Sequence, residues 1–99
     1  MEDITAQELK QRLDANEDVV VIDVREEWEY EEVNIGAQNI PLGHLPEKLE
    51  AISHLKEIEF IVHCRTGGRS TTARKYLEKQ GFTKVRSLAE GIEGFLKLD

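Results

Sequence analysis

The only cysteine of the 99-residue chain, Cys64, begins a short loop that carries two glycines and two arginines. The loop continues as Arg65, Thr66, Gly67, Gly68 and Arg69. An apolar run at residues 60–62 precedes the loop, and a helix is predicted from Ser70. A thiol at this junction faces the unpaired backbone N–H groups of the first helical turn. These groups and the helix dipole favour thiolate over thiol, so the pattern predicts a nucleophilic cysteine.

The arginines and glycines of the loop support the same interpretation. Arg65 and Arg69 place permanent positive charge beside the thiol, which we expect to lower its pKa further. Gly67 and Gly68 allow several backbone N–H groups to point at one centre, and we expect a Cβ at Gly68 to prevent the turn from closing. A structural cysteine, a small buried hydrophobe, needs no such neighbours. We therefore interpret the loop as an anion-binding cup around a reactive sulfur.

The chain as a whole is acidic, with 20 acidic and 13 basic residues and a net charge of −7. This charge argues against a nucleic-acid partner, because phosphate backbones select basic surfaces. The two loop arginines are local exceptions, which indicates a small anionic ligand. A hydrophobic content of 39% and a charged content of 33% are typical of a soluble globular protein. The length predicts one domain, which we take as residues 1–99.

The location is predicted from cysteine usage and from the absence of targeting patterns. A lone cysteine forms no internal disulfide, which suits a reducing compartment. Residues 1–5 show neither the basic region nor the apolar stretch of a signal peptide. No apolar run approaches membrane-spanning length, so we expect a cytoplasmic protein without membrane contact.

Helix-type and strand-type patterns alternate along the chain. Helices are predicted at residues 6–16, 26–32, 49–55, 70–80 and 91–98, and strands at residues 19–22, 38–40, 60–62 and 85–88. Thr5 and Glu8 have the spacing of a capping box at the first helix. The alternation predicts an α/β fold, with a mostly parallel central sheet and helices on both faces. Such sheets bind ligands at the carboxyl ends of their strands, which is where Cys64 falls.

Several motifs, taken in order, resemble those of single-domain rhodaneses. They are Asp23-Val24-Arg25-Glu26, the segment 36–41 (GAQNIP), the loop 64–69, Gly81-Phe82 with Val85, and the segment 88–95. The resemblance covers nearly the whole chain. It departs from the family pattern at Asn34, where a histidine is frequent, at Glu90, where a glycine is usual, and at Phe95, where a tryptophan is common.

The resemblance implies sulfur transfer within a rhodanese-like domain. The Cys64 thiolate would take the outer sulfur of thiosulfate, expel sulfite and become a persulfide, from which cyanide or a thiol removes the sulfur. The backbone amides of Thr66, Gly67 and Gly68 would stabilise the persulfide. Arg65 and Arg69 would hold the sulfonate end of the donor. No metal or organic cofactor is implied.

Three alternative functions compete with this interpretation. A persulfide carrier that serves a protein partner would need the same loop chemistry. A cysteine phosphatase or arsenate reductase is suggested by the histidine before Cys64 and by Arg69-Ser70, but that signature places five residues between cysteine and arginine, whereas this chain has four. A non-catalytic binding module on the same fold commonly lacks the cysteine that this chain keeps.

Other residues near the motifs are assigned structural roles. His63 precedes the nucleophile on a strand, so its side chain should point to the opposite face of the sheet. Asp23 and Arg25 are expected to form a structural ion pair. Trp28 and Tyr30 are expected to contribute packing, and the acidic run 26–32 to form a solvated face.

Overall fold

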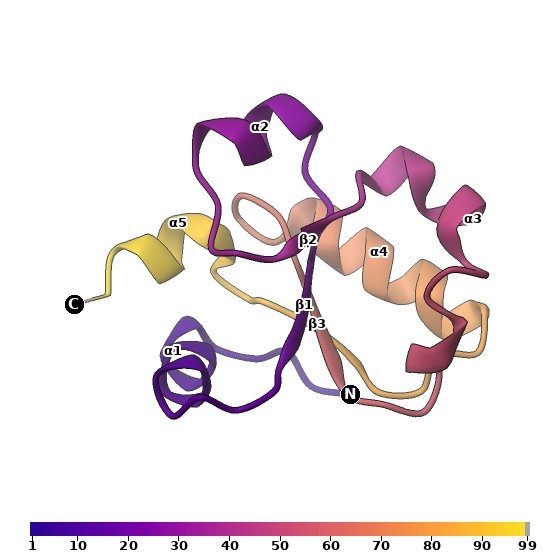
Figure 1. Cartoon of the computed structure of the whole chain (residues 1–99), viewed down its shortest axis with the longest axis horizontal. Helices are drawn as coiled ribbons and strands as arrows, with labels where there is room; N and C mark the ends of the chain where they lie inside the picture. The colour runs from indigo at the N-terminus through magenta and orange to yellow at the C-terminus, as the bar shows by residue number, and fades with distance from the viewer. Residues whose placement is uncertain (99) are drawn as a thin grey trace.

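Four short strands form one parallel sheet at the centre of the molecule (Figure 1). The computed structural model describes residues 1–98. The strands are β1 (Val20–Asp23), β2 (Gln38–Asn39), β3 (Phe60–His63) and β4 (Val85–Ser87), in the order β2-β1-β3-β4. Every pair of neighbours is parallel, and β1 and β3 pair along their whole length from Val20–Phe60 to Asp23–His63. The carboxyl ends of the strands therefore meet at one edge of the sheet.

Helices cover both faces of the sheet, which confirms the predicted α/β fold (Figure 1). They are α1 (Ala6–Asp14), α2 (Glu27–Glu32), α3 (Leu45–Lys48), α4 (Gly68–Lys79) and α5 (Gly91–Leu96). Two short 3-10 turns, η1 (Leu42–His44) and η2 (Ser53–Leu55), flank α3. α1 and α5 lie on one face, α3 and α4 on the other, and α2 lies at the carboxyl end of β1. Within residues 1–98, none of the helices has the length and apolar character needed to cross a bilayer.

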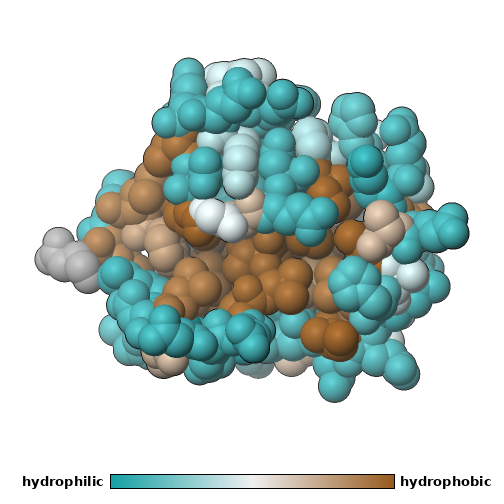
Figure 2. All heavy atoms as spheres, in the orientation of Figure 1, coloured by the Kyte–Doolittle hydropathy of each residue, from teal (hydrophilic) through white to brown (hydrophobic). Residues whose placement is uncertain are grey.

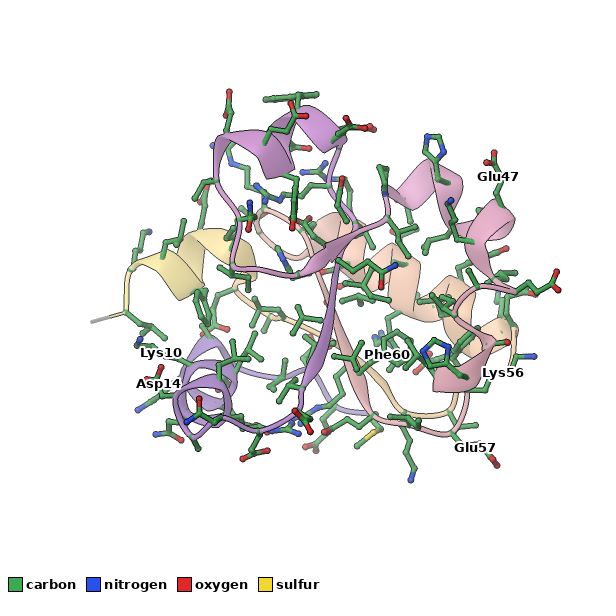
Figure 3. All side chains as sticks on the ribbon, in the orientation of Figure 1. Lys10, Asp14, Glu47, Lys56, Glu57 and Phe60 are labelled. Carbon is green, nitrogen blue, oxygen red and sulfur yellow. The ribbon has the colours of Figure 1, made fainter. Side chains whose placement is uncertain are left out.

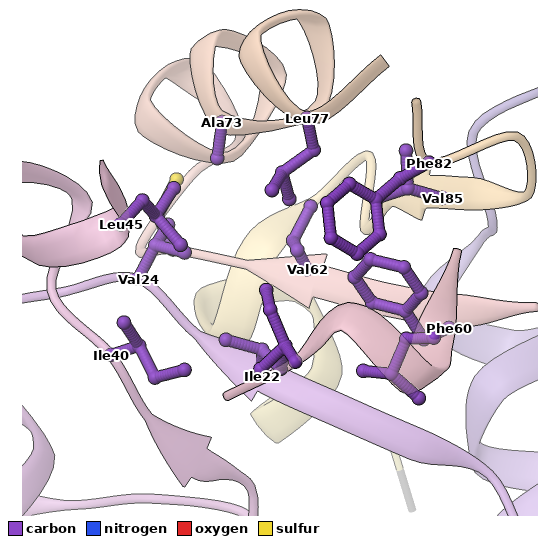
Figure 4. Close-up of a cluster of buried hydrophobic side chains, with 13 residues drawn as sticks. Ile22, Val24, Ile40, Leu45, Phe60, Val62, Ala73, Leu77, Phe82 and Val85 are labelled. Atoms are coloured by element: carbon purple, nitrogen blue, oxygen red, sulfur yellow. The ribbon is translucent and has the colours of Figure 1, made fainter. Parts of the chain in front are cut away.

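The side chains of β3 alternate between two apolar clusters, one on each face of the sheet. Phe60, Val62 and Cys64 belong to the cluster under α3 and α4, which Figure 4 shows in close-up. Ile61 belongs to the cluster under α1, beside Leu9. β3 is therefore buried on both faces. This packing holds in place the strand that ends immediately before Cys64.

Strand β1 is less completely buried than its apolar sequence predicts. Val20 and Val21 are half-buried, whereas Ile22 and Asp23 are fully buried. The edge strand β2 pairs only with Ile22 and Asp23, so the first half of β1 lacks a neighbour on that side. A continuous apolar run such as residues 19–22 is typical of a strand buried on both faces, and only the second half of β1 is buried in this way.

The predicted helix at residues 49–55 is wrong, because this segment is broken into turns. α3 ends at Lys48, and Leu55 N–H donates to the carbonyl of Ile52 at 2.9 Å, a one-turn contact of 3-10 type. Apolar residues three apart, Leu49, Ile52 and Leu55, fit consecutive tight turns as well as a helix.

The first helix is shorter than predicted and is capped by half of the expected motif. It ends at Asp14, and Asn16 takes a left-handed φ of 61°. The Thr5 hydroxyl accepts a hydrogen bond from Glu8 N–H at 3.0 Å, as expected for the cap. The Glu8 carboxylate instead contacts Arg86 at 3.0 Å. The cap therefore satisfies one helix donor, and Glu8 serves to tie α1 to β4.

Candidate active site

Cys64 lies directly after β3, at the carboxyl edge of the sheet, and is 1% exposed. Its Sγ accepts hydrogen bonds from Gly67 N–H at 3.1 Å and from Ser70 N–H at 3.3 Å. The Ser70 hydroxyl lies 3.6 Å from the same sulfur. α4 begins at Gly68, two residues earlier than predicted, so its first turn surrounds the sulfur. The expected arrangement, a thiol facing the amino end of a helix, is confirmed.

The surroundings of Cys64 lower the pKa of its thiol below the ordinary value. Burial acts in the opposite direction and raises the pKa, because it disfavours the charged form. Hydrogen bonds from the Ser70 hydroxyl and from the N–H groups of Ser70, Gly67 and Thr66 outweigh burial. The shift toward the thiolate form therefore comes mainly from neutral donors.

Ser70 is a site residue that the sequence reasoning missed, since it was treated only as the start of a helix. Its hydroxyl is fully buried, lies 2.7 Å from the Ser87 hydroxyl and is 3.2 Å from the Gly67 carbonyl. The available signal was a hydroxyl residue in the first turn of the helix after the cysteine loop, where it can reach back to the sulfur.

The carbonyl groups of the loop are bound by the amino end of α5. Ile92 N–H donates to the Cys64 carbonyl at 2.9 Å, and Glu93 N–H donates to the Arg65 carbonyl at 3.1 Å. Gly91 precedes them with a φ of 65°, and an added Cβ there would overlap the Arg65 carbonyl. With the Cys64 and Arg65 carbonyls bound by α5, the loop backbone is held with N–H groups directed at the sulfur.

The glycine that the turn requires is Gly67, and the expectation for Gly68 is wrong. Gly67 has a φ of 114°, and an added Cβ would lie 2.8 Å from the Ala89 carbonyl oxygen. Gly68 is the first residue of α4, and an added Cβ there would meet open space. The sequence shows two adjacent glycines but cannot show which one takes the left-handed conformation.

Both loop arginines form ion pairs with glutamates from other elements. Arg65 Nε lies 2.6 Å from Glu93 Oε2 on α5. Arg69 donates two hydrogen bonds to Glu29 on α2, at 2.6 and 2.9 Å. The bonds from Arg69 lower the pKa of Glu29 to about 2, so its carboxylate stays charged at neutral pH. The two arginines predicted to bind the anionic donor therefore lie beside the loop, but each one is already paired with a carboxylate.

His63 points away from the sulfur, as predicted. Its Nδ1 lies 3.2 Å from the Cys64 carbonyl oxygen, and its Nε2 lies 3.7 Å from Asp23 Oδ2 on the opposite face of the sheet. Burial lowers the pKa of His63, so the ring is neutral at neutral pH. His63 therefore contacts the backbone of Cys64, whereas the Cys64 Sγ is contacted by the loop and the first turn of α4.

The predicted structural ion pair between Asp23 and Arg25 is also confirmed. Arg25 Nη2 lies 2.7 Å from Asp23 Oδ2, and both side chains are buried. The same Nη2 donates to the Val33 carbonyl at 2.7 Å. This pair fixes the end of α2 against the end of β1, close to the cysteine loop.

The two aromatic residues of α2 differ in their surroundings. The Tyr30 hydroxyl donates to the Ala37 carbonyl at 2.6 Å, in agreement with a packing role. Trp28 is 62% exposed, so the expectation that it packs is wrong. Helical spacing did not show which side of this glutamate-rich helix faces solvent.

The three departures from the family pattern have structural roles. Asn34 donates to the Tyr30 carbonyl at 3.0 Å and accepts from Gly36 N–H at 2.9 Å, which shapes the turn after α2. The Glu90 carboxylate accepts from Ala6 N–H at 2.9 Å at the start of α1. Phe95 packs against the cluster under α1. None of the three contacts Cys64.

Comparison with known proteins identifies the family. The profile of the rhodanese-like domain matches residues 5–98. YtwF of Bacillus subtilis, provisionally named a sulfurtransferase, is 42% identical over 86% of this chain and 82% of its own length. YrkF of the same organism, provisionally named a sulfur carrier protein, is 36% identical over 91% of this chain, which spans only 48% of YrkF. The human single-domain sulfurtransferase TSTD1 superposes with a TM-score of 0.85 at 25% identity, over 98% of this chain and 96% of its own.

A profile match over nearly the whole chain and a relative this similar settle its classification. The protein belongs to the rhodanese-like domain family. The loop after β3, with its thiol and inward N–H groups, is the candidate site for the chemistry of this family.

Proposed function

We propose that the protein is a sulfurtransferase that carries sulfur on Cys64 as a persulfide. The observation behind this proposal is the set of N–H and hydroxyl groups around a thiol whose pKa they lower. A thiolate is the nucleophilic form of cysteine, and the same donors can stabilise the anion of a persulfide. The relatives named for sulfur transfer and sulfur carriage support the same reaction class.

The proposed reaction has two steps. In the first, the Cys64 thiolate attacks the outer sulfur of thiosulfate; the new S–S bond forms as the bond to the sulfonate sulfur breaks, and sulfite leaves with its electron pair. In the second, an acceptor thiolate attacks the outer sulfur of the Cys64 persulfide. The acceptor becomes a persulfide, and Cys64 is released as thiolate. Together the two steps constitute covalent catalysis with ping-pong kinetics, and neither step uses a metal or organic cofactor.

In this mechanism the backbone N–H groups of Thr66, Gly67 and Gly68, together with Ser70, surround the transferred sulfur. Arg65 and Arg69 bind the sulfonate of the donor. Because Glu93 and Glu29 form ion pairs with these two arginines, the donor has to compete with a carboxylate for each guanidinium group. The Arg65–Glu93 pair is exposed and weak enough to exchange, whereas the Arg69–Glu29 pair, with Glu29 only 12% exposed, is held more firmly.

A second candidate is a sulfur carrier that passes the Cys64 persulfide to another protein. The ion pairs of both loop arginines favour it, since they reduce the attraction of the site for a small dianion. The domain would then be loaded by one protein and discharged by another. We propose one rhodanese-like domain over residues 1–99 in either case, and a reducing, cytoplasmic compartment in which the free thiol persists.

Intact-protein mass spectrometry tests the proposal. Incubation with thiosulfate should add one sulfur atom to the wild-type mass, and cyanide should remove it as thiocyanate. Cys64→Ser should gain no sulfur and produce no thiocyanate. Thiocyanate formation by Cys64→Ser at the wild-type rate would contradict the proposal, as would hydrolysis of an aryl phosphate faster than sulfur transfer.

A further inference from the structure

A pocket of about 260 Å³ opens between α2 and α5, beside the cysteine loop. Its lining includes three apolar side chains that project into solvent: Trp28 is 62% exposed, Leu96 51% and Val33 42%. In Figure 2, hydrophobic side chains gather over α5, below the hydrophilic surface of α2. Exposed tryptophan is costly in water and is enriched where proteins bind partners.

The pocket is continuous with the active-site loop. Arg65, the residue after the nucleophile, lines it together with Glu93. Ile92 also lines it, and its N–H holds the Cys64 carbonyl at 2.9 Å. A molecule bound in this pocket therefore contacts both the cysteine loop and α5, whose N–H groups bind the loop carbonyls.

Acidic side chains outnumber basic ones in the pocket lining, where Glu29, Glu32 and Glu93 face Arg25 and Arg65. Arg25 is buried in its ion pair with Asp23. The sequence of α2, EWEYEE, and that of α5, GIEGFL, contain five glutamates and no basic residue. Arg65 and Arg69, the nearby loop cations, are paired with Glu93 and Glu29. Glu32, which lines the pocket, forms no ion pair within the described residues, and neither do Glu27 and Glu31 on the same helix, so α2 carries uncompensated negative charge.

We propose that the α2–α5 pocket docks a basic protein that exchanges sulfur with Cys64. An apolar side chain of the partner enters between Trp28 and Leu96, and flanking lysines or arginines contact the free glutamates of α2. Opposite charge attracts a basic partner to this surface. A second copy of the chain is repelled, because it would bring one acidic α2 against another. This inference rests on the proposed function and names the class of protein that supplies or receives the sulfur.

Two peptide probes of opposite charge test the inference. Each is a heptapeptide with a central cysteine between two leucines; its four outer residues are lysine in one probe and glutamate in the other. The protein is first loaded with thiosulfate, and the Cys64 persulfide is verified by mass. Transfer of the sulfur to each peptide is then followed by mass spectrometry at increasing peptide concentration. We expect the lysine peptide to discharge the persulfide about tenfold more efficiently.

Matched variants locate the binding surface. Trp28→Ala and Glu32→Lys should each reduce the advantage of the lysine peptide several-fold while persulfide loading stays normal. Ile58→Ala and Glu57→Lys are the controls. Ile58 is 50% exposed and Glu57 is exposed, and both precede β3 at the opposite end of the sheet, where Figure 3 labels Glu57. They should leave the advantage unchanged.

The outcomes separate the inference from the function on which it rests. No added sulfur on the wild-type protein would overturn both. Normal loading with equal discharge by the two peptides, or an advantage that Trp28→Ala and Glu32→Lys leave intact, would overturn the docking surface alone. Sedimentation that shows a wild-type dimer dissociated by Trp28→Ala would place a second copy on this surface and would also overturn the inference.

Discussion

Two neighbouring regions of the site differ in charge: one consists of neutral hydrogen-bond donors and the other of ion pairs. The cradle, formed by the N–H groups of Thr66, Gly67 and Ser70 and by the Ser70 hydroxyl, contains no charged group, and its Gly67 and Ser70 are buried. The rim, formed by Arg65, Arg69, Glu29 and Glu93, consists of partly exposed ion pairs. Neutral donors fixed by a fold keep their effect in salt, whereas exposed ion pairs are screened and exchange partners. We propose that the cradle sets the reactivity of the sulfur and that the rim selects the molecules that approach it.

The largest expected effect comes from closing the cradle with a side chain. Gly67→Ala forces a left-handed residue with its Cβ against the Ala89 carbonyl, so the turn has to shift and its N–H groups leave the sulfur. We expect sulfur transfer to fall by roughly a hundredfold or more, since a single preorganised donor is worth about that much. Steady-state thiocyanate formation measures it.

Gly68→Ala is the matched control for this variant, because its Cβ meets open space at the start of α4. It should retain near-normal activity and stability, measured by urea unfolding. Equal losses in the two variants would mean that the loop tolerates no side chain at either glycine, and that the specific role of Gly67 is wrong.

Removing one cradle donor should have an intermediate effect. Ser70→Ala deletes the hydroxyl that lies 3.6 Å from the sulfur and leaves the backbone donors in place. A hydrogen bond to a charged group contributes about 1.5–3 kcal/mol, so persulfide formation at neutral pH should slow roughly tenfold or more. Ser87→Ala, which removes a hydroxyl that is hydrogen-bonded to Ser70 and not to the sulfur, should slow persulfide formation much less. Rapid-quench loading with thiosulfate compares the two.

Releasing a rim arginine should change binding more than chemistry. Glu93→Gln removes the carboxylate from Arg65 and frees its guanidinium for a sulfonate. We expect the KM for thiosulfate to fall several-fold at low salt, with kcat nearly unchanged. The difference from wild type should shrink as ionic strength rises. A change in kcat of the same size would show that the rim takes part in the chemistry and would break the distinction between the two regions.

The smallest effect concerns stability in acid. Glu29 has a pKa of about 2 in the folded protein, below the ordinary 4.5. A carboxylate with a lowered pKa stabilises the fold above its unfolded pKa, and this stability is lost as pH falls from about 4.5 to about 2. Because Arg69 is 36% exposed, solvent reduces the contribution to about 1 kcal/mol. Urea unfolding of wild type and Glu29→Gln should converge over this pH range.

The sequence predicted the elements that burial determines. The apolar run at 60–62 and the cysteine, glycines and arginines after it located the loop between a central strand and a helix, and the structure has them there. Sequence reasoning failed where the outcome depends on distant residues. Glu29 is 40 positions from Arg69, and Glu93 is 28 positions from Arg65, so no local pattern pairs them.

Side-chain direction and backbone conformation were equally hidden from the sequence. Trp28 was expected to pack because tryptophan usually does, but α2 has glutamates on all sides and no apolar stripe to orient it. The choice between Gly67 and Gly68 depends on Ala89, which reaches the loop only in the folded chain. These are the positions where packing, and not propensity, decides the structure.

The pH dependence of Cys64 alkylation tests the central claim most directly. The rate with iodoacetamide reports the thiolate fraction in wild type, in Ser70→Ala and in the double variant Arg65→Ala/Arg69→Ala. Wild type should titrate below the value of about 8.5 for free cysteine. Ser70→Ala should raise the midpoint, because it removes a hydrogen bond that lowers the pKa of Cys64, and the double arginine variant should raise it by clearly less. A midpoint that stays in place in Ser70→Ala and rises fully in the arginine variant would contradict the account, because the rim would then hold the sulfur as an anion.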